Sequence, residues 1–209
     1  MTDFAGTGLA AHGIACTRGG RGLFEGLDIA IEPGGAMLLC GPNGSGKTSL
    51  LRLLAGFLEP ADGWLTWNGR AVVEDIQAYQ SQLAYVGHLD AVKRSLSVTE
   101  NVEFWAGLQG ADADPLAVLG SLGIGSLAAL PARFLSAGQR RRLGLARLAV
   151  APKPLWLLDE PTVTLDTASI TMVEALIARH RVGGGMVVVA SHVTLDLPGA
   201  AVLDLRALS

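Results

Sequence analysis

Short apolar runs alternate with longer stretches of helical periodicity along most of the chain. Four runs have the length of buried strands and stop at glycine or at polar residues: Gly35–Cys40, Leu83–Val86, Leu155–Leu158 and Met186–Ala190. Helical patterns predict five helices: Lys47–Leu58, Ser97–Leu108, Asp114–Leu122, Ala137–Val150 and Thr167–His180. Apolar strands that alternate with helices predict an α/β fold, with a mostly parallel sheet covered on both faces.

The N-terminal part has a different pattern. Leu9–Cys16 and Leu23–Ile31 are predicted strands on either side of a polar turn, Thr17–Gly22. Trp64–Trp67 alternates and ends at Asn68-Gly69, which is a hairpin signal. We therefore expect an antiparallel β part at the N-terminus. We treat the chain as one domain, 1–209, with a core formed by 1–88 and 136–209 and a helical subdomain at about 89–135.

Composition raises the question of whether the chain crosses a membrane. Of the 209 residues 50% are hydrophobic and only 17% are charged, and the mean hydropathy is +0.40. A membrane-spanning helix needs roughly 20 mostly apolar residues in a row. The apolar runs in this chain are much shorter. We therefore expect the apolar excess in a buried core or on a surface that a partner covers.

Charge, cysteines and the N-terminus argue against other classes. The formal net charge of −3 offers no basic surface for nucleic acid, so no nucleic-acid partner is expected. Cys16 and Cys40 lie far apart without a CxxC motif, and we expect both to be reduced. Residues 1–4 show no basic region followed by an apolar run, so we expect no signal peptide.

Residues 41–48 carry a specific chemical signal. Their sequence, Gly-Pro-Asn-Gly-Ser-Gly-Lys-Thr, fits the phosphate-loop pattern G-x-x-x-x-G-K-[ST] between a predicted strand and a predicted helix. Backbone N–H groups of such a loop bind phosphate oxygens, the lysine reaches the β- and γ-phosphates, and the hydroxyl binds Mg²⁺. The expected ligands are ATP and Mg²⁺. The residues assigned to ATP binding are Gly41, Pro42, Asn43, Gly44, Ser45, Gly46, Lys47, Thr48 and Ser49, with Lys47 also assigned to catalysis and Thr48 to the metal.

Two carboxylates follow the apolar run Leu155–Leu158. A buried strand that ends in Asp159 and Glu160 delivers both acids to the carboxyl edge of the sheet, where ligands bind in such folds. We expect Asp159 to be the Mg²⁺ partner, through water. We expect Glu160 to polarise the attacking water. The pattern is weak alone, but it is specific when it accompanies the phosphate loop.

At Leu135-Ser136-Ala137-Gly138-Gln139 the chain resembles the LSGGQ signature of the ATP-binding cassette (ABC) ATPases, with Ala at the third position. The resemblance covers nearly the whole chain and implies a P-loop NTPase fold of the ABC type, with a RecA-like core. It implies that Ser136, Ala137, Gly138 and Gln139 bind the γ-phosphate of ATP held by the other subunit, in a head-to-tail dimer. A helix N-cap alone would also account for Ser136, but the segment lies about twenty residues before the acidic strand, as it does in the family, and this position favours the signature. We expect Arg140, Arg141, Arg142 and Arg147 to form a solvated helix face.

Further positions take their roles from the resemblance. His192 matches the switch histidine, which contacts the γ-phosphate and helps to order the water. Thr164-Leu165-Asp166 matches the D-loop, and Asp166 can also cap the following helix. Two positions depart from the family pattern. His88 stands where the family has glutamine, and Arg18 stands near the place of an aromatic residue that stacks on adenine. A guanidinium plane can also stack on a base.

Within the family, the short length, Gly87-His88, the signature alanine and Gly22–Leu27 resemble the ATPase subunits of the cytochrome c maturation transporter. That subgroup implies integral-membrane partner subunits and a peripheral place on the cytoplasmic face of the bacterial inner membrane. It also implies a role in heme export or in the release of heme-loaded chaperone. By the same resemblance, the segment His88–Phe104 is the expected docking surface for the membrane subunit.

Three alternatives remain at this stage. A soluble ABC ATPase of an assembly scaffold would share every motif. A P-loop kinase of small metabolites would account for the phosphate loop but not for residues 136–139 or His192. A nucleotide-binding module without hydrolysis is disfavoured because both Glu160 and His192 are present.

Overall fold

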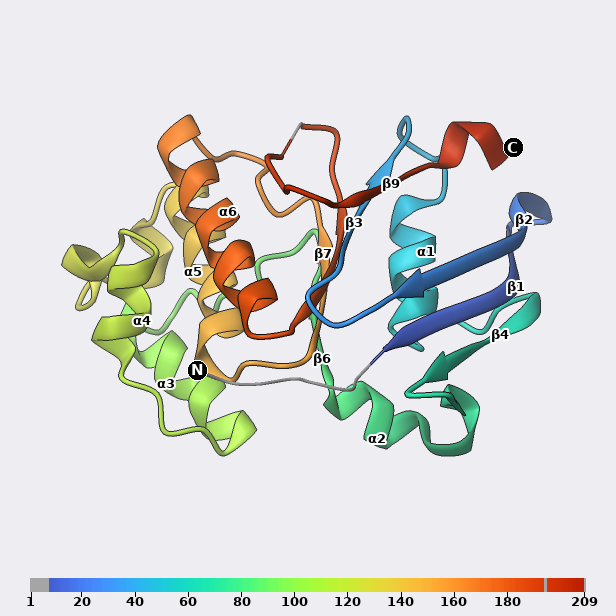
Figure 1. Ribbon diagram of the computed structural model, residues 1–209. Coiled ribbons are helices and arrows are strands. Elements are labelled where there is room, and N and C mark those ends of the chain that lie inside the picture. Colours follow the sequence, from blue (N-terminus) through green and yellow to red (C-terminus); the bar gives the residue numbers. More distant parts are fainter. Residues whose placement is uncertain (1–7, 194, 209) are drawn as a thin grey trace.

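The computed structural model describes residues 8–193 and 195–208, with side chains up to Arg206. Residues 1–4, on which the expectation about a signal peptide rests, lie outside this part. Two sheets and a group of helices make up the described chain (Figure 1). No helix in the described ranges is both long and apolar enough to span a bilayer.

The central sheet has five strands in the order β6-β7-β8-β3-β9, and all four pairings are parallel. The strands are β3 (Ala36–Cys40), β6 (Leu83–Val86), β7 (Leu155–Asp159), β8 (Met186–Ala190) and β9 (Ala201–Asp204). Four of them are the predicted apolar runs, and the predicted α/β fold is confirmed. The edge strand β9 was not predicted, because it is short and none of its four residues is buried: two are exposed and two are half-buried.

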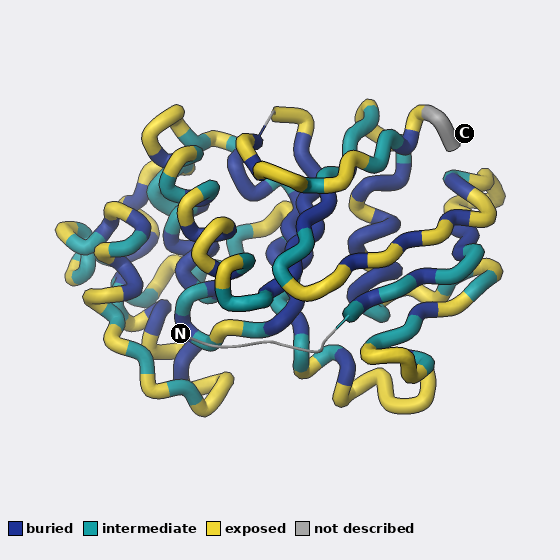
Figure 2. The backbone as a smooth tube through the Cα atoms, in the orientation of Figure 1, coloured by how far each residue is buried: buried dark blue, intermediate teal, exposed yellow. Residues whose placement is uncertain are grey.

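Both faces of this sheet are buried. In β7, Leu155 and Leu157 belong to one apolar core, and Trp156 and Leu158 belong to the other. The first core also contains α1 (Lys47–Leu54), which lies between the two sheets (Figure 1). The second contains residues of α5 (Ala137–Val150) and α6 (Thr167–Val182), on the opposite face. The strands therefore form a buried layer through the middle of the molecule (Figure 2).

The N-terminal sheet is antiparallel, as predicted, with the order β2-β1-β4-β5. Its strands are β1 (Leu9–Arg18), β2 (Arg21–Ile31), β4 (Asp62–Trp67) and β5 (Arg70–Ala71). The turn between β1 and β2 is shorter than predicted. Gly19 and Gly20 have φ angles of 59° and 79°, and they close a two-residue hairpin in which Arg18 pairs with Arg21. Arg18 thus lies on a strand end.

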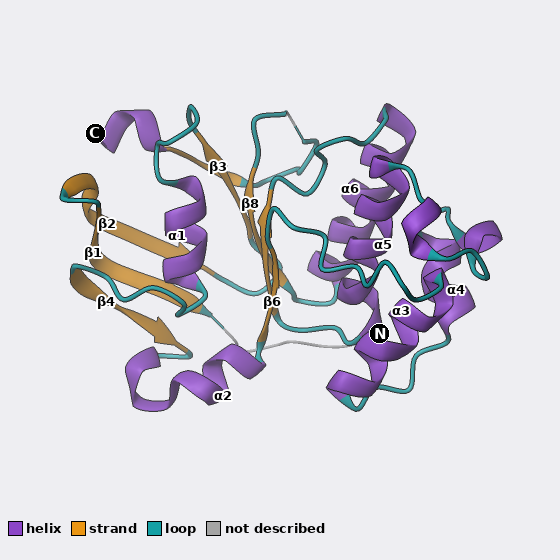
Figure 3. Cartoon of the chain, turned by 180° about the vertical axis from the view of Figure 1, so that it is seen from behind, coloured by secondary structure: helices purple, strands orange, loops and turns teal. Residues whose placement is uncertain are grey.

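The remaining helices lie largely where the sequence predicts them. They are α2 (Ile76–Ser81), α3 (Val98–Gln109) and α4 (Pro115–Ser121), with 3₁₀ turns at Val72–Asp75, Gly125–Leu127, Ala132–Phe134 and Leu205–Leu208. Helix α2 was not predicted. Helices α3 and α4 pack outside α5 (Figure 3), and α3 begins with the predicted capping box of Ser97 and Glu100.

Helix α1 is shorter than predicted, because it ends in a Schellman motif. Gly56 has a φ of 67°, and its N–H donates to the Leu53 carbonyl. The Phe57 N–H donates to the Arg52 carbonyl, which completes the motif. The chain therefore leaves the helix after Leu54 and turns toward β4. Cys16 and Cys40 are both free thiols, as predicted.

Candidate functional site

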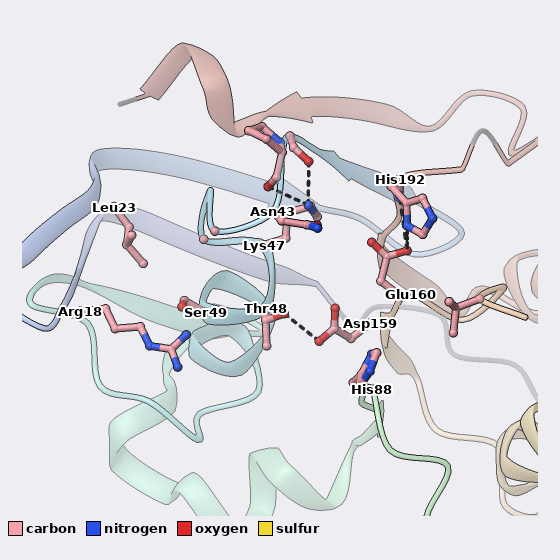
Figure 4. A pocket seen from close by; sticks show the side chains of 15 residues that line it. Arg18, Leu23, Asn43, Lys47, Thr48, Ser49, His88, Asp159, Glu160 and His192 are labelled. Carbon is pink, nitrogen blue, oxygen red and sulfur yellow. Dashed lines mark hydrogen bonds and ion pairs between the residues drawn. The ribbon is translucent and has the colours of Figure 1, made fainter.

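The carboxyl edge of the parallel sheet borders a cavity of about 630 Å³ (Figure 4). Most of the residues that the sequence assigned to one site meet here. The lining residues are Arg18, Leu23, Gly41, Pro42, Asn43, Gly44, Gly46, Lys47, Thr48, Ser49, His88, Asp159, Glu160, Val163 and His192. Strands β3, β7 and β8 therefore deliver the phosphate loop, the two acids and the histidine to one place. Leu23 and Val163 are additions, since an isolated apolar residue in a loop or strand gives no signal of a site.

Two glycines allow the phosphate loop to curl between β3 and α1. A Cβ atom on Gly41 would lie 2.6 Å from Ser45 Oγ, so a side chain there would collide with the loop. Gly46 has a φ of 100° and is the N-cap of α1, a conformation that side chains disfavour. The loop thus leads directly into the N-terminus of α1, where free N–H groups favour an anion.

Lys47 is buried at the centre of this loop. Its Nζ atom donates to the carbonyl oxygens of Gly41 at 2.6 Å and Pro42 at 3.1 Å. An ammonium group has three donors. Two of them hold the lysine against its own loop, and the group lines the cavity beside Asn43 (Figure 4). A phosphate in the cavity would lie within reach of this charge.

The two predicted metal ligands are adjacent. Thr48 Oγ1, in the first turn of α1, donates to Asp159 Oδ2 at the end of β7 over 2.9 Å. A hydroxyl and a carboxylate are oxygen donors of the kind that Mg²⁺ takes, and Mg²⁺ sites commonly use one or two carboxylates together with substrate phosphates. The donor set fits the predicted ion. The described residues hold no cluster of three or more His, Cys, Asp or Glu side chains that could bind a metal unaided.

Glu160 and His192 form the second adjacent pair. His192 Nδ1 lies 2.7 Å from Glu160 Oε2, and the His192 backbone N–H donates to the same oxygen over 3.3 Å. The Glu160 side chain is 16% exposed and that of His192 is 57% exposed. Glu160 has a φ of 50°, in the left-handed region that side chains rarely adopt, as functional residues often do.

The two positions that depart from the family pattern both line the cavity. Arg18 approaches from the end of β1 and His88 from the loop after β6 (Figure 4). Both side chains are exposed. Arg18 is therefore available to a nucleotide base, and His88 lies near Asp159 on the metal side of the cavity.

The signature residues lie outside the cavity of their own chain. Ser136 caps α5 by accepting from the Gln139 N–H at 3.2 Å, while Gln139 Oε1 accepts from the Ser136 N–H at 2.9 Å. This capping box accounts for the helix start. Gly138 packs against the D-loop, since a Cβ there would lie 2.9 Å from the Thr164 carbonyl oxygen. Ser136 and Gln139 are thus presented at the surface beside Thr164.

Asp166 is the N-cap of α6. Its carboxylate accepts from the Ser169 N–H at 2.8 Å. Hydrogen bonds from the side chain and the backbone of Ser169 lower the pKa of Asp166. The capping role expected for this residue is confirmed. Thr164, two residues earlier, has a φ of 66°, so the turn before α6 is held in a conformation that a threonine rarely adopts.

One expectation for α5 is wrong. Arg140, Arg141, Arg142 and Arg147 do not form a solvated face, because Arg141 is 1% exposed and the other three are half-buried. Burial lowers the pKa of Arg147. Successive helix residues are about 100° apart, so three consecutive arginines cannot all face water on a helix that is buried along one side. The helical spacing of these arginines could therefore have shown from the sequence that at least one of them is buried.

The fold and the cavity together define an ATP-binding subunit of the ABC transporter class. The family model described as "ABC transporter" matches residues 24–163, which include the phosphate loop, the signature and the acidic strand end. The chain belongs to this family. The predicted fold and the predicted enzyme class, an ABC-type ATPase, are confirmed.

Curated relatives with high sequence identity indicate a subgroup within this family. The chain is 56% identical over 197 residues to the cytochrome c biogenesis ATP-binding export protein CcmA of Rhodospirillum rubrum, covering 94% of this chain and 84% of the relative. It is 52% identical over 201 residues to the CcmA of Paramagnetospirillum magneticum, covering 94% and 93%. The resemblance to a CcmA-type ATP-binding protein is thereby confirmed.

A solved structure supports the fold. An ABC transporter ATP-binding protein from Pyrococcus furiosus superimposes with a TM-score of 0.84 at 24% identity, covering 97% of this chain and 99% of that one. At this identity the likeness concerns the fold alone. It extends over the antiparallel sheet, the parallel sheet and the helices together, since nearly the whole of both chains is matched.

Proposed function

We propose that this chain is the ATP-hydrolysing subunit of an ABC exporter in cytochrome c biogenesis. The observation that carries the proposal is the cavity in which Lys47, Thr48, Asp159, Glu160 and His192 meet. The names of the relatives supply the biological process. Heme export, or release of a heme-loaded chaperone, is the work that we assign to the complex. We keep the division into a core and a helical subdomain at about 89–135 as part of this proposal.

The geometry supports hydrolysis at the γ-phosphate. Glu160 accepts a proton from the attacking water, the new bond forms between that water oxygen and the γ-phosphorus, and the bond to ADP breaks. His192 holds the carboxylate through Nδ1, and we assign its Nε2 to a γ-phosphate oxygen. Lys47 offsets the charge of the leaving group. Thr48 and Asp159 would hold Mg²⁺, which supplies charge neutralisation at the phosphates.

A second copy completes the site in this proposal. Ser136 and Gly138 open α5 at a surface outside the cavity, so the signature of one copy is free to contact ATP bound by the other. The N-terminus of a helix favours an anion. We therefore propose that two copies close head to tail over two ATP molecules and that hydrolysis reopens the dimer.

We propose that integral-membrane subunits dock near the segment His88–Phe104, on the cytoplasmic face of the inner membrane. The segment ends within α3, and apolar side chains are exposed in the segment and in the remainder of that helix, with Leu89 at 81%, Phe104 at 36% and Leu108 at 69%. Lys93 Nζ lies 4.3 Å from the centre of the Phe104 ring. We take these exposed apolar side chains as support for a docking surface, because a partner that covers them would remove them from water.

The substitution Glu160→Gln tests the hydrolytic site. The amide keeps the size of the side chain but cannot accept the proton, so we expect hydrolysis to fall by about 10²–10⁴-fold. ATP binding should persist, and size-exclusion chromatography with ATP should show a trapped dimer. Glu32→Gln, at an exposed position before β3, is the matched control. Normal turnover by Glu160→Gln would remove Glu160 from the role of base.

Co-purification tests the biological assignment. The tagged chain, extracted from membranes in mild detergent, should bring down a polytopic membrane protein, and the double variant Leu89→Glu, Leu108→Glu should release it. Both side chains are exposed, so these changes should leave the fold of the free chain intact, which a thermal melt checks. Recovery only with soluble scaffold proteins would reject the exporter in favour of the assembly-scaffold alternative.

A further inference from the structure

Arg141 is a fully buried arginine in the second turn of α5, with 1% of its surface exposed. A guanidinium group has five N–H donors, and all five have an acceptor here. Nε donates to the Pro161 carbonyl at 3.1 Å, and Nη2 donates to the carbonyls of Asp159 at 2.9 Å and Glu160 at 2.7 Å. Nη1 donates to the Gly87 carbonyl at 3.1 Å and to Asp90 Oδ1 at 3.0 Å.

Three of these acceptors are consecutive peptide carbonyls at the end of β7. They belong to the turn that carries Glu160, whose φ of 50° is disfavoured for any residue with a side chain. Such a conformation persists only when its surroundings hold it. On one side, the Glu160 N–H donates to the Ala190 carbonyl at 2.8 Å. On the other side, Arg141 fixes the carbonyl oxygens, so the peptide planes on both sides of Glu160 are set.

The other two acceptors belong to the loop after β6. This loop, residues 87–90, contains His88, which lines the cavity. Asp90 also lies 3.8 Å from Arg140 Nε. Gly144 lets the loop approach closely, because a Cβ on that residue would lie 2.8 Å from the Asp90 carbonyl oxygen. The loop is therefore seated on α5 by two arginines and by the absence of a side chain at position 144.

We propose that Arg141 is a positioning residue that sets the Glu160 turn and ties it to the loop 87–90 and to the signature helix. One rigid planar group joins α5, the end of β7 and the loop after β6. If the loop 87–90 moves, the Arg141 side chain would therefore shift the Glu160 carbonyl with which it also forms a hydrogen bond. The inference rests on the proposed role of Glu160, and it adds the group that holds Glu160 in place.

Arginine is the side chain that suits this task. Its five donors are arranged in a fixed plane and serve acceptors on two sides at once. Lysine has three donors on a flexible stem, and it cannot reach all five acceptors. Methionine would fill a similar volume but would leave four carbonyl oxygens and the Asp90 carboxylate without this partner. We therefore expect Arg141→Lys to lose some of these hydrogen bonds and Arg141→Met to lose all of them.

Arg142→Met is the matched control for these variants. Arg142 is the next residue of the same helix and is half-buried. Its Nη1 atom donates to the carbonyls of Leu122 at 3.3 Å and Gly123 at 3.2 Å, and within the described part of the chain it forms no hydrogen bond or ion pair with β7 or with the loop 87–90. The variant Arg142→Met removes an equal charge from α5, together with two hydrogen bonds to backbone carbonyls.

Three measurements on the full chain test the proposal: steady-state ATP hydrolysis, equilibrium binding of a fluorescent ATP analogue, and hydrogen exchange of the Glu160 and Val163 amides. Misplacing a reacting group by about 1 Å can cost about 100-fold in rate. We expect kcat to fall about 100-fold in Arg141→Met and about 10-fold in Arg141→Lys. Nucleotide affinity should change less than about 3-fold, because the phosphate loop is untouched. The two amides should exchange faster in Arg141→Met and at the wild-type rate in Arg142→Met.

The outcomes separate this inference from the function on which it rests. If Arg141→Met keeps the wild-type kcat or the wild-type exchange at Glu160, Arg141 is not a positioning residue. An equal loss of binding and turnover, shared with Arg142→Met, would make its role merely structural. If Arg141→Met behaves as expected while Glu160→Gln still hydrolyses ATP at the normal rate, Arg141 is a positioning residue and Glu160 is not the base. Arg141→Lys carries the test if the methionine variant does not fold.

Discussion

His192 Nδ1 lies 2.7 Å from Glu160 Oε2, although the two residues are far apart in the sequence. The contact follows from the register of two neighbouring parallel strands. Asp159, the last residue of β7, pairs with Ala190, the last residue of β8. Both strands therefore end at the same level of the sheet. The Glu160 carboxylate and the His192 imidazole meet just beyond this carboxyl edge.

Replacing His192 by alanine should slow hydrolysis without weakening the fold. The side chain is 57% exposed, so its loss removes little packing. Loss of one group that stabilises transition-state charge typically costs about 10²–10³-fold in kcat. Phosphate release assays would measure the rate, and a thermal melt would check that the fold is intact. His12→Ala, which removes an imidazole stacked on Trp64 outside the cavity, should hydrolyse ATP normally.

Thr48 offers a sharp test of the metal site. Thr48→Val keeps the shape but removes the hydroxyl that contacts Asp159, whereas Thr48→Ser retains it. We expect the valine variant to need at least about 10-fold more Mg²⁺ for half-maximal hydrolysis, as lost metal-site interactions commonly cost 10–100-fold. The serine variant should stay close to the wild type. Identical Mg²⁺ titrations for the two variants would exclude Thr48 as a ligand. Chelation of the metal should abolish turnover in all forms.

Gly138 should behave opposite to an ordinary helical glycine. Glycine to alanine inside a helix usually stabilises by about 0.8–1 kcal/mol. At Gly138 the new Cβ would lie 2.9 Å from the Thr164 carbonyl oxygen, and a backbone atom cannot easily move away. We expect Gly138→Ala to destabilise the chain by about 1–3 kcal/mol, as overpacking does. Gly107, inside α3, has no neighbouring atom within 4 Å of its would-be Cβ. Urea unfolding should give a higher free energy of unfolding for Gly107→Ala than for the wild type, and a lower one for Gly138→Ala.

His180 should make the stability of the chain depend on pH. The ring stacks on Trp156 at 3.7 Å, and burial lowers its pKa to about 4 from 6.5. The unfolded chain therefore binds a proton more readily than the folded chain between these values. Stability is fully present above about pH 6.5 and falls as the pH drops toward 4, by about 3 kcal/mol from this group.

Urea unfolding from pH 7 to 4.5 measures this effect by difference. The variant His180→Gln keeps a donor for the Met186 carbonyl, to which Nε2 lies at 3.2 Å. The stability of this variant should fall less steeply with decreasing pH than that of the wild type, because it lacks the buried imidazole. The carboxylates contribute equally in the two proteins, so the difference between the slopes reports His180 alone. Parallel slopes for the two proteins would show that the folded state does accept the proton on His180.

The sequence predicted the site better than it predicted the side chains that support it. Residues 41–48, Asp159 and Glu160 are recognisable because phosphate chemistry restricts both residue types and spacing, and the parallel strand order then brings them together. Arg141 was misjudged because composition alone suggests that a run of arginines faces water. Its partners are mostly backbone carbonyls, which leave no trace in the sequence.

The same reason explains the differences in the fold. The predicted boundaries of α5, β6 and β8 are those observed, because apolar periodicity defines them on both sides. Helix α1 ends early, since a glycine cap overrode a leucine pattern that continued to Leu58. Strand β9 and helix α2 are short and half-exposed, and their form depends on what they pack against rather than on their own sequence.

The strand order has a consequence for the chain during its synthesis. Strand β3, which leads into the phosphate loop, has β8 and β9 as its two neighbours, and both lie far downstream of it in the sequence. Long-range parallel pairings form late because loop closure must precede them. A growing chain that has been synthesised only as far as Lys47 therefore lacks both hydrogen-bonded neighbours of the strand that supports its phosphate loop. We therefore expect nucleotide binding only after β8 and β9 have been synthesised and have paired with β3.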